Sequence, residues 1–137
     1  MIAIIRIRGL VGKKIDVENT MERLGLKRKF VCVVVKENPE TIGMIKKIEN
    51  FVAYGKISKE TFLELVKKRG ESLGNKIDVE KIGEYFEGKT GKSLKEIGIK
   101  PFFRLHPPRG GIETKARAPK GVLGKNDKIN ELIMRML

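Results

Sequence analysis

The sequence predicts a two-layer fold in which helices pack against one β-sheet. Three strand-like apolar segments alternate with two amphipathic helical segments in the first 57 residues, in the order β-α-β-α-β. Hydrophobic residues make up 40% of the 137-residue chain, enough for one core beneath an unusually polar exterior. Because strands and amphipathic helices each have an apolar face to bury, packing the helices on the sheet is the natural arrangement.

The first strand is expected at residues 2–8, IAIIRIR, where apolar and basic side chains alternate. The alternation puts Ile5 and Ile7 on one side and Arg6 and Arg8 on the other. This strand is therefore predicted to have a single buried face.

A short amphipathic helix follows, capped by Asp16 and ended by Gly25. Its apolar positions are Val17, Met21 and Leu24. The next strand, residues 30–35, reads FVCVVV and is apolar on both faces, so Cys32 in its middle is expected to be a core residue.

The second helix is predicted to begin at Asn38, because asparagine caps helices and a proline follows it. Its inner face is expected to hold Ile42, Ile45, Ile48 and Val52. A third, shorter strand covers residues 51–57 and is weakened by Gly55. Ser58 then caps a helix over residues 58–70, with an apolar stripe of Phe62, Leu65 and Val66.

Further helical segments are expected at residues 78–88, 93–98 and 126–137; the second carries a capping box and the last should dock on the core. We therefore divide the chain, as a single compact domain, into a β-α-β-α-β core (1–57), a helical extension (58–99), a basic arm (100–125) and a C-terminal helix (126–137).

Basic side chains outnumber acidic ones by 30 to 17, which gives a formal net charge of +13. The surplus lies at the two ends: residues 1–56 carry 12 basic and 6 acidic side chains, and residues 99–137 carry 9 and 3. This polarity favours a polyanionic partner, namely a nucleic acid, an anionic membrane surface or an acidic protein.

Cys32 is the only cysteine, so no internal disulfide can form, which suits a reducing compartment. No apolar run approaches the roughly 18 residues of a membrane span, and the N-terminal segment lacks a signal-peptide cleavage site. We expect a cytoplasmic protein that does not bind to membranes.

The chain offers little material for catalysis. Residues 88–93, GKTGKS, end like a phosphate-binding loop, but the spacing requires a glycine or alanine where Phe86 stands. One histidine and one cysteine offer too few side chains for a Cys-His nucleophile pair or a histidine metal site. We predict no catalytic residue, metal, cofactor or small-molecule substrate; a phosphate-handling enzyme that uses residues 88–93 is a rival hypothesis.

The basic arm has the composition of a phosphate-binding segment. From Pro107 to Lys125 it has only three sizeable apolar side chains, too few to order the segment by its own packing. A merely soluble loop would carry mixed charge, whereas the only acid here is Glu113. Glycines allow close approach to a phosphate chain and arginines clamp its oxygens. The predicted phosphate contacts are Arg104, Arg109, Lys115, Arg117 and Lys120.

Aromatic residues stand at the root of this arm. His106 is expected to form hydrogen bonds or to stack at the RNA rather than to bind a metal. Phe102 and Phe103 alternate along the strand-like FFRLH, so one is expected to anchor the arm in the core and the other is a candidate for stacking on a base.

A second set of predicted contacts lies on the core, in the connections before the first helix and before the second strand. Its members are Lys13, Lys14, Lys27, Arg28 and Lys29. Together with the arm, these cations suit a double-stranded RNA that is held through phosphates and ribose hydroxyls.

Two stretches, GLKRKFVCVVVKENPETIGMIKKIENFVAYGKI at residues 25–57 and FRLHPPRGG at residues 103–111, resemble one family of large-subunit ribosomal proteins, numbered thirty in archaea and bacteria and seven in the eukaryotic cytosol. The second stretch is similar to the long archaeal and eukaryotic form. The bacterial form resembles only the first 57 or so residues, whereas the resemblance as a whole covers essentially the entire chain.

The resemblance implies an α+β fold related to the ferredoxin-like fold, with a largely antiparallel three-stranded sheet of order 3-1-2. The crossover rule alone would make the first two strands parallel. The resemblance also implies a non-enzymatic protein that binds large-subunit ribosomal RNA near the central protuberance during translation, among neighbouring ribosomal proteins. A free-standing RNA-binding or RNA-remodelling module is the alternative.

The composition of the arm yields a first test. In the free protein, the amides of residues 110–120 are expected to exchange with little protection, and ribosomal RNA is expected to protect them. Hydrogen exchange followed by mass spectrometry, with and without RNA, measures this. Equal protection in both states would contradict an arm that is ordered by RNA.

Overall fold

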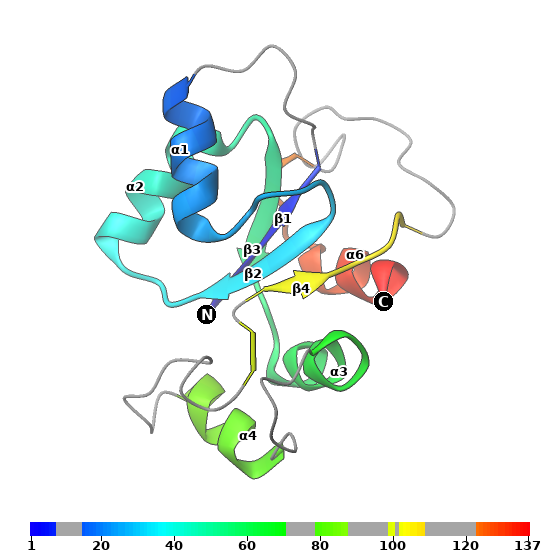
Figure 1. Cartoon of the computed structure of the whole chain (residues 1–137). Coiled ribbons are helices and arrows are strands. Elements are labelled where there is room, and N and C mark those ends of the chain that lie inside the picture. Colours follow the sequence, from blue (N-terminus) through cyan, green and yellow to red (C-terminus); the bar gives the residue numbers. More distant parts are fainter. Residues whose placement is uncertain (8–14, 71–78, 88–98, 101, 109–122) are drawn as a thin grey trace.

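The computed structural model describes residues 1–7, 15–70, 79–87, 99–100, 102–108 and 123–137, and shows a sheet with helices on both faces (Figure 1). In chain order the elements are β1 (Ile2–Arg6), α1 (Ile15–Leu24), β2 (Val31–Val35), α2 (Pro39–Ile48), β3 (Val52–Lys56), α3 (Lys59–Arg69), α4 (Val79–Glu87), β4 (Phe103–Arg104), β5 (Gly124–Lys125) and α6 (Ile129–Met136).

The five strands lie in the order β4-β2-β1-β3-β5. β1 pairs antiparallel with both β2 and β3, with Ile4 opposite Val33 on one side and opposite Tyr54 on the other. The antiparallel three-stranded core of order 3-1-2 is confirmed, and the parallel pairing favoured by the crossover rule is wrong. Cys32 near the start of β2 lies opposite Ile5, so the chain re-enters the sheet at the end where it left and makes no crossover along it.

The central strand contributes to two cores, which corrects the prediction that only one of its faces is buried. Ala3 and Ile5 belong to the core that includes residues of α3, α4 and α6, whereas Ile2 and Ile4 belong to the core with α1 and α2. Arg6 alternates with Ile5 and is only 1% exposed. The prediction failed because the middle strand of a sheet that is covered on both sides has no open face.

The predicted two-layer core is present as the sheet with α1 and α2 (Figure 1). On the other face, α3 and α6 add a further layer, and α4 packs against α3. Cys32 is fully buried in this second core, as expected.

Local sequence signals explain where the helices begin. Asn38 is extended, and its side-chain oxygen accepts a hydrogen bond from the backbone of Thr41 at 2.8 Å. Ser58 caps α3 in the same way, so both predicted caps are confirmed. α1 begins at Ile15, however, which places Asp16 inside the first turn, where its charge still suits the positive end of the helix.

The C-terminal helix docks on the core as predicted, with its apolar stripe buried: Ile129, Leu132, Ile133 and Met136. Two short strands extend the sheet beyond the three-stranded core, since β4 lies antiparallel beside β2 and β5 lies parallel to β3. The helix expected at residues 93–98 lies outside the described residues, as do residues 109–122 of the arm.

The close packing of β3 under α6 can be tested at a glycine. A Cβ atom at Gly55 would collide with the backbone oxygen of Asn126 and approach the side chain of Ile129 to 3.0 Å. Gly55→Ala is therefore expected to lower the free energy of unfolding by about 2 kcal/mol. Gly43→Ala is the matched control, because nothing lies within 4 Å of that position on α2, and it should raise stability by about 0.5–1 kcal/mol. Equilibrium unfolding in urea measures both, and equal stabilities would contradict the packing.

The buried thiol makes stability depend on alkaline pH. Burial raises the pKa of Cys32 to about 12, whereas a cysteine in an unfolded chain has a pKa of about 8.5. The folded state therefore holds this proton more tightly, and the resulting stability is complete below about pH 8.5 and lost as the pH rises toward 12. Above about pH 8.5 the free energy of unfolding should therefore fall with pH. Its slope should be steeper than that of Cys32→Ala by up to about 1.4 kcal/mol per pH unit. Denaturant midpoints over a pH series measure this, and parallel curves would contradict it.

Candidate nucleic-acid interface

The basic turn, residues 27–29, begins where α1 ends. Gly25 has a φ of 84°, a conformation that favours glycine, and its N–H donates to the carbonyl of Glu22. Leu26 N–H donates to the carbonyl of Met21, which completes a Schellman closure of the helix. Because Leu26 is buried, the chain is anchored just before the three exposed cations Lys27, Arg28 and Lys29.

Arg6 of the central strand holds the basic turn at both ends. Its Nη1 donates a hydrogen bond to the carbonyl of Leu26 at 2.8 Å, and its own carbonyl accepts one from Phe30 N–H at 2.7 Å. Phe30 has a φ of 64°, a left-handed conformation that a bulky residue keeps only when its surroundings impose it. The turn is therefore fixed by the interior of the sheet.

Burying the guanidinium of Arg6, which forms the bond to Leu26, costs desolvation free energy. Burial lowers the pKa of Arg6, while the carboxylate of Glu18 acts in the opposite direction. An arginine remains charged at neutral pH even so. Its bond to Leu26 is thus a charge-assisted hydrogen bond in a buried site, which is stronger than a bond between neutral groups.

β4 places an aromatic ring and a further cation beside the basic turn. Phe103 points into the core with α3 and is fully buried, which confirms that one of the two phenylalanines anchors this segment. Phe102 packs partly exposed against the opposite core, and Arg104 lies on the same face as Phe102 because side chains alternate along a strand. Leu105 N–H donates to the carbonyl of Phe30 at 3.1 Å and so joins this segment to the turn.

A groove of about 410 Å³ lies between the basic turn and β4. Its lining residues are Gly25, Lys27, Arg28, Val31, Phe102 and Arg104. The guanidinium carbon of Arg104 lies 5.7 Å from the centre of the Phe102 ring, within the range of a cation–π contact. Three cations and no carboxylate are among the described residues that line this basic groove, so it favours an anion.

Two other predicted contacts have different surroundings. Lys29 Nζ lies 5.4 Å from the centre of the Phe30 ring and is not part of the groove lining. Both ring nitrogens of His106 lie within hydrogen-bonding distance of carbonyl oxygens, those of Pro107 and Leu137. His106 therefore links the segment after β4 to the residue that follows α6, and its ring edge already contacts protein.

The structure thus brings Lys27, Arg28 and Arg104 together although they lie far apart in the sequence. Six of the predicted contacts lie outside the described residues: Lys13, Lys14, Arg109, Lys115, Arg117 and Lys120.

Sequence reasoning missed the role of Arg6. The sequence did contain a signal for its burial. Ile2 and Ile4 lie on the same face of the strand as Arg6, so the face assigned to the arginines is also apolar. An arginine at the end of an apolar strand face needs a carbonyl partner when it is buried. Which carbonyl it meets depends on the fold, and sequence spacing does not identify Leu26.

The described part of the chain has neither a metal-binding cluster nor a membrane-spanning helix. No three His, Cys, Asp or Glu side chains lie there in a group that could hold a metal ion. None of the described helices is long and apolar enough to cross a membrane.

The whole chain is similar to archaeal ribosomal proteins. The profile of the family described as Ribosomal protein L30p/L7e matches residues 2–52. The protein named large ribosomal subunit protein uL30 from Methanococcus vannielii is 41% identical, with 98% of each chain covered. The protein of the same name from Staphylothermus marinus is 42% identical, and the match covers 98% of this chain and 97% of that protein. The one from Archaeoglobus fulgidus is 36% identical, and the match covers 99% of each chain. The similarity therefore extends past the profile match to β4 and α6.

The contribution of the Arg6–Leu26 hydrogen bond to stability can be tested without RNA. Arg6→Ala removes the bond to Leu26 and leaves a cavity, so the free energy of unfolding should fall by about 3 kcal/mol. Arg23→Ala, at an exposed arginine of α1, is the control and should change it by less than about 0.5 kcal/mol. Urea unfolding measures both. Similar stabilities of the two variants would mean that the buried guanidinium does not support the fold.

Proposed function

Because the chain belongs to the L30p/L7e family of large-subunit ribosomal proteins, we propose that it is a structural constituent of the large ribosomal subunit, where it binds large-subunit ribosomal RNA through the basic groove and the arm. The family membership agrees with the resemblance of residues 25–57 and 103–111. This family is structural rather than enzymatic. The proposed location is the cytoplasmic ribosome, beside ribosomal RNA and neighbouring ribosomal proteins.

The observation that supports RNA binding most directly is the composition of the basic groove. Lys27 and Arg28 reach it from the basic turn, and Arg104 reaches it from β4. Arginine guanidiniums can bind two phosphate oxygens at once, and lysine adds a point charge. Neighbouring phosphates of one RNA strand would therefore satisfy all three cations.

The groove is held by hydrogen bonds within the protein itself. Arg6 fixes the turn, and the bond from Leu105 to Phe30 fixes the segment after β4 relative to it. Pre-formed sites lose less conformational entropy on binding. Phe102 would supply an apolar wall on which a ribose or an unpaired base packs, while Arg104 beside its ring contacts phosphate.

We propose that the arm and the first connection extend this contact. The arm residues Arg109, Lys115, Arg117 and Lys120 would follow the RNA strand away from the groove, and Lys13 and Lys14 in the connection before α1 would add further charge. Recognition by phosphates and ribose hydroxyls suits structured RNA, whose base edges are hard to reach in the deep groove. His106 would contribute through its ring faces, because its nitrogens contact protein.

Charge removal at the basic groove tests this proposal. The double variant Lys27→Ala/Arg28→Ala should bind large-subunit RNA more weakly. The slope of log K against log salt is near −4 if about five phosphates are neutralised, and in this variant it should become shallower by about 2. The control Lys68→Ala/Lys128→Ala removes the same charge from exposed positions near α3 and α6 and should leave the slope nearly unchanged. Filter binding over a salt series measures the slope.

Two results would oppose the proposal. Equal slopes for the two double variants would mean that the charge acts diffusely and not through the groove. A chain that binds RNA but does not cosediment with large subunits in high salt would point to a free-standing RNA-binding module.

A further inference from the structure

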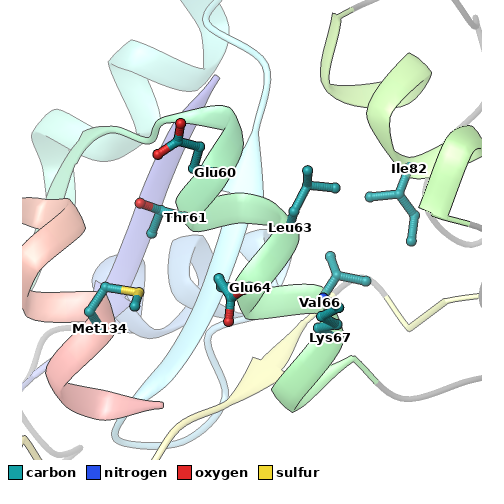
Figure 2. Close-up of a pocket in the computed structure, with 8 residues that line it drawn as sticks. All are labelled: Glu60, Thr61, Leu63, Glu64, Val66, Lys67, Ile82 and Met134. Carbon is teal, nitrogen blue, oxygen red and sulfur yellow. The ribbon is translucent and has the colours of Figure 1, made fainter.

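A second groove, of about 640 Å³, lies over α3 between α4 and α6 (Figure 2). Its lining residues are Glu60, Thr61, Leu63, Glu64, Val66, Lys67, Ile82 and Met134. Figure 2 shows Ile82 of α4 on one side of α3 and Met134 of α6 on the other. We call this region the α3 groove.

The α3 groove includes exposed apolar surface, contributed by Met134 and in part by Leu63. Met134 is 46% exposed and, in the described part of the chain, is one of two large hydrophobic residues that are exposed. It lies on the outer side of α6, whose other apolar residues are buried in the core. Leu63 is only partly buried although it occupies the middle of α3. Met134 and Leu63, beside the buried side chains of Val66 and Ile82, therefore offer a small apolar surface for a contact.

The charge of the α3 groove is opposite to that of the rest of the chain. Glu60, Leu63, Glu64 and Lys67 have the spacing i, i+3, i+4 and i+7, so they form one outward stripe of α3. Two carboxylates and one ammonium group thus surround the apolar centre, on a chain whose formal net charge is +13. Such a surface repels RNA phosphates and attracts a cationic segment.

The two grooves belong to opposite faces of the sheet. The basic groove is lined by Val31 and Phe102, which pack with the core that includes α1 and α2. The α3 groove is lined by Val66 and Ile82, which belong to the core on the other face. RNA that lies in the basic groove therefore leaves the α3 groove open to a different partner.

We propose that the α3 groove binds a peptide segment of another protein in which aliphatic or aromatic side chains alternate with lysine or arginine. The apolar side chains of this segment contact Met134 and Leu63, and its cations pair with Glu60 and Glu64. A volume of about 640 Å³ holds several side chains. Binding at this surface does not require the basic groove and goes beyond the proposed RNA contact.

Binding of designed peptides to the free protein gives the first test. The probes are a fluorescein-labelled peptide of alternating leucine and lysine blocks, its leucine–glutamate counterpart, and a serine–lysine peptide of the same charge as the first. Only the leucine–lysine peptide should bind, even though the chain is cationic overall. Tight binding of the leucine–glutamate peptide, or equal binding of the serine–lysine peptide, would overturn the proposal.

Substitutions in the α3 groove test whether the leucine–lysine peptide binds there. Glu60→Gln/Glu64→Gln and, separately, Met134→Ser should each weaken binding of the leucine–lysine peptide by about tenfold. The control Glu37→Gln/Glu40→Gln removes the same charge at exposed positions before and in α2 and should have no effect. Fluorescence anisotropy measures the affinities. Equal effects of the two glutamate pairs would overturn the proposal.

Crosslinking in the assembled subunit identifies the natural occupant. A benzophenone amino acid at position 134 should crosslink to an apolar, lysine- or arginine-rich segment of another ribosomal protein, identified by mass spectrometry of the joined peptides. The same label at position 46, on the exposed side of α2, should not capture that segment. Crosslinks from position 134 to RNA, to a second copy of this chain, or to nothing would overturn the proposal.

Peptide binding at the α3 groove and RNA binding at the basic groove can be tested separately. Lys27→Ala/Arg28→Ala should leave the affinity for the leucine–lysine peptide unchanged, and Glu60→Gln/Glu64→Gln should not weaken RNA binding. Loss of both activities in either variant would contradict two independent surfaces.

Discussion

The bond from the buried guanidinium of Arg6 to the carbonyl of Leu26 connects the interior of this protein to the basic turn. Burying a charge costs free energy, and the bond from Nη1 to Leu26 offsets part of that cost only while the turn keeps its position. The same residue accepts a bond from Phe30 through its backbone, and Phe30 in turn accepts one from Leu105. The basic turn, the start of β2 and the segment after β4 are thereby held in one arrangement. The groove that they form therefore depends on the same bonds that hold these segments to the sheet.

Much of the fold was predictable because its signals are local. The cap at Asn38, the cap at Ser58 and the apolar stripe of α6 each depend on residues within one or two helical turns, and the structure contains all three. The burial of Phe103 was foreseen for a similar reason, since alternation along a strand puts one of two adjacent aromatics inside. The orientation of the first two strands was not local information: it followed from the family resemblance and contradicted the general rule for crossovers.

The candidate site was only partly predictable. Net charge and the KRK sequence identified the basic turn, but nothing in their spacing places Arg104 beside Arg28, because that contact depends on the pairing of β4 with β2. The α3 groove had no sequence signal that separates it from an ordinary solvated helix face: Glu60, Glu64 and Lys67 look like the mixed charge of a soluble surface. It becomes distinctive only when α6 brings Met134 next to them.

The two shortest strands have a consequence for how the chain avoids unwanted association. β2 and β3 would be the outer strands of the three-stranded core, and an exposed outer strand offers unpaired backbone groups to any other chain. β4 and β5, of two residues each, pair with them instead. Each added strand ends in a cation, Arg104 or Lys125, and like charges at the borders of two molecules discourage sheet-to-sheet growth. The two short strands thus reduce the length of backbone edge through which two copies of the chain could pair.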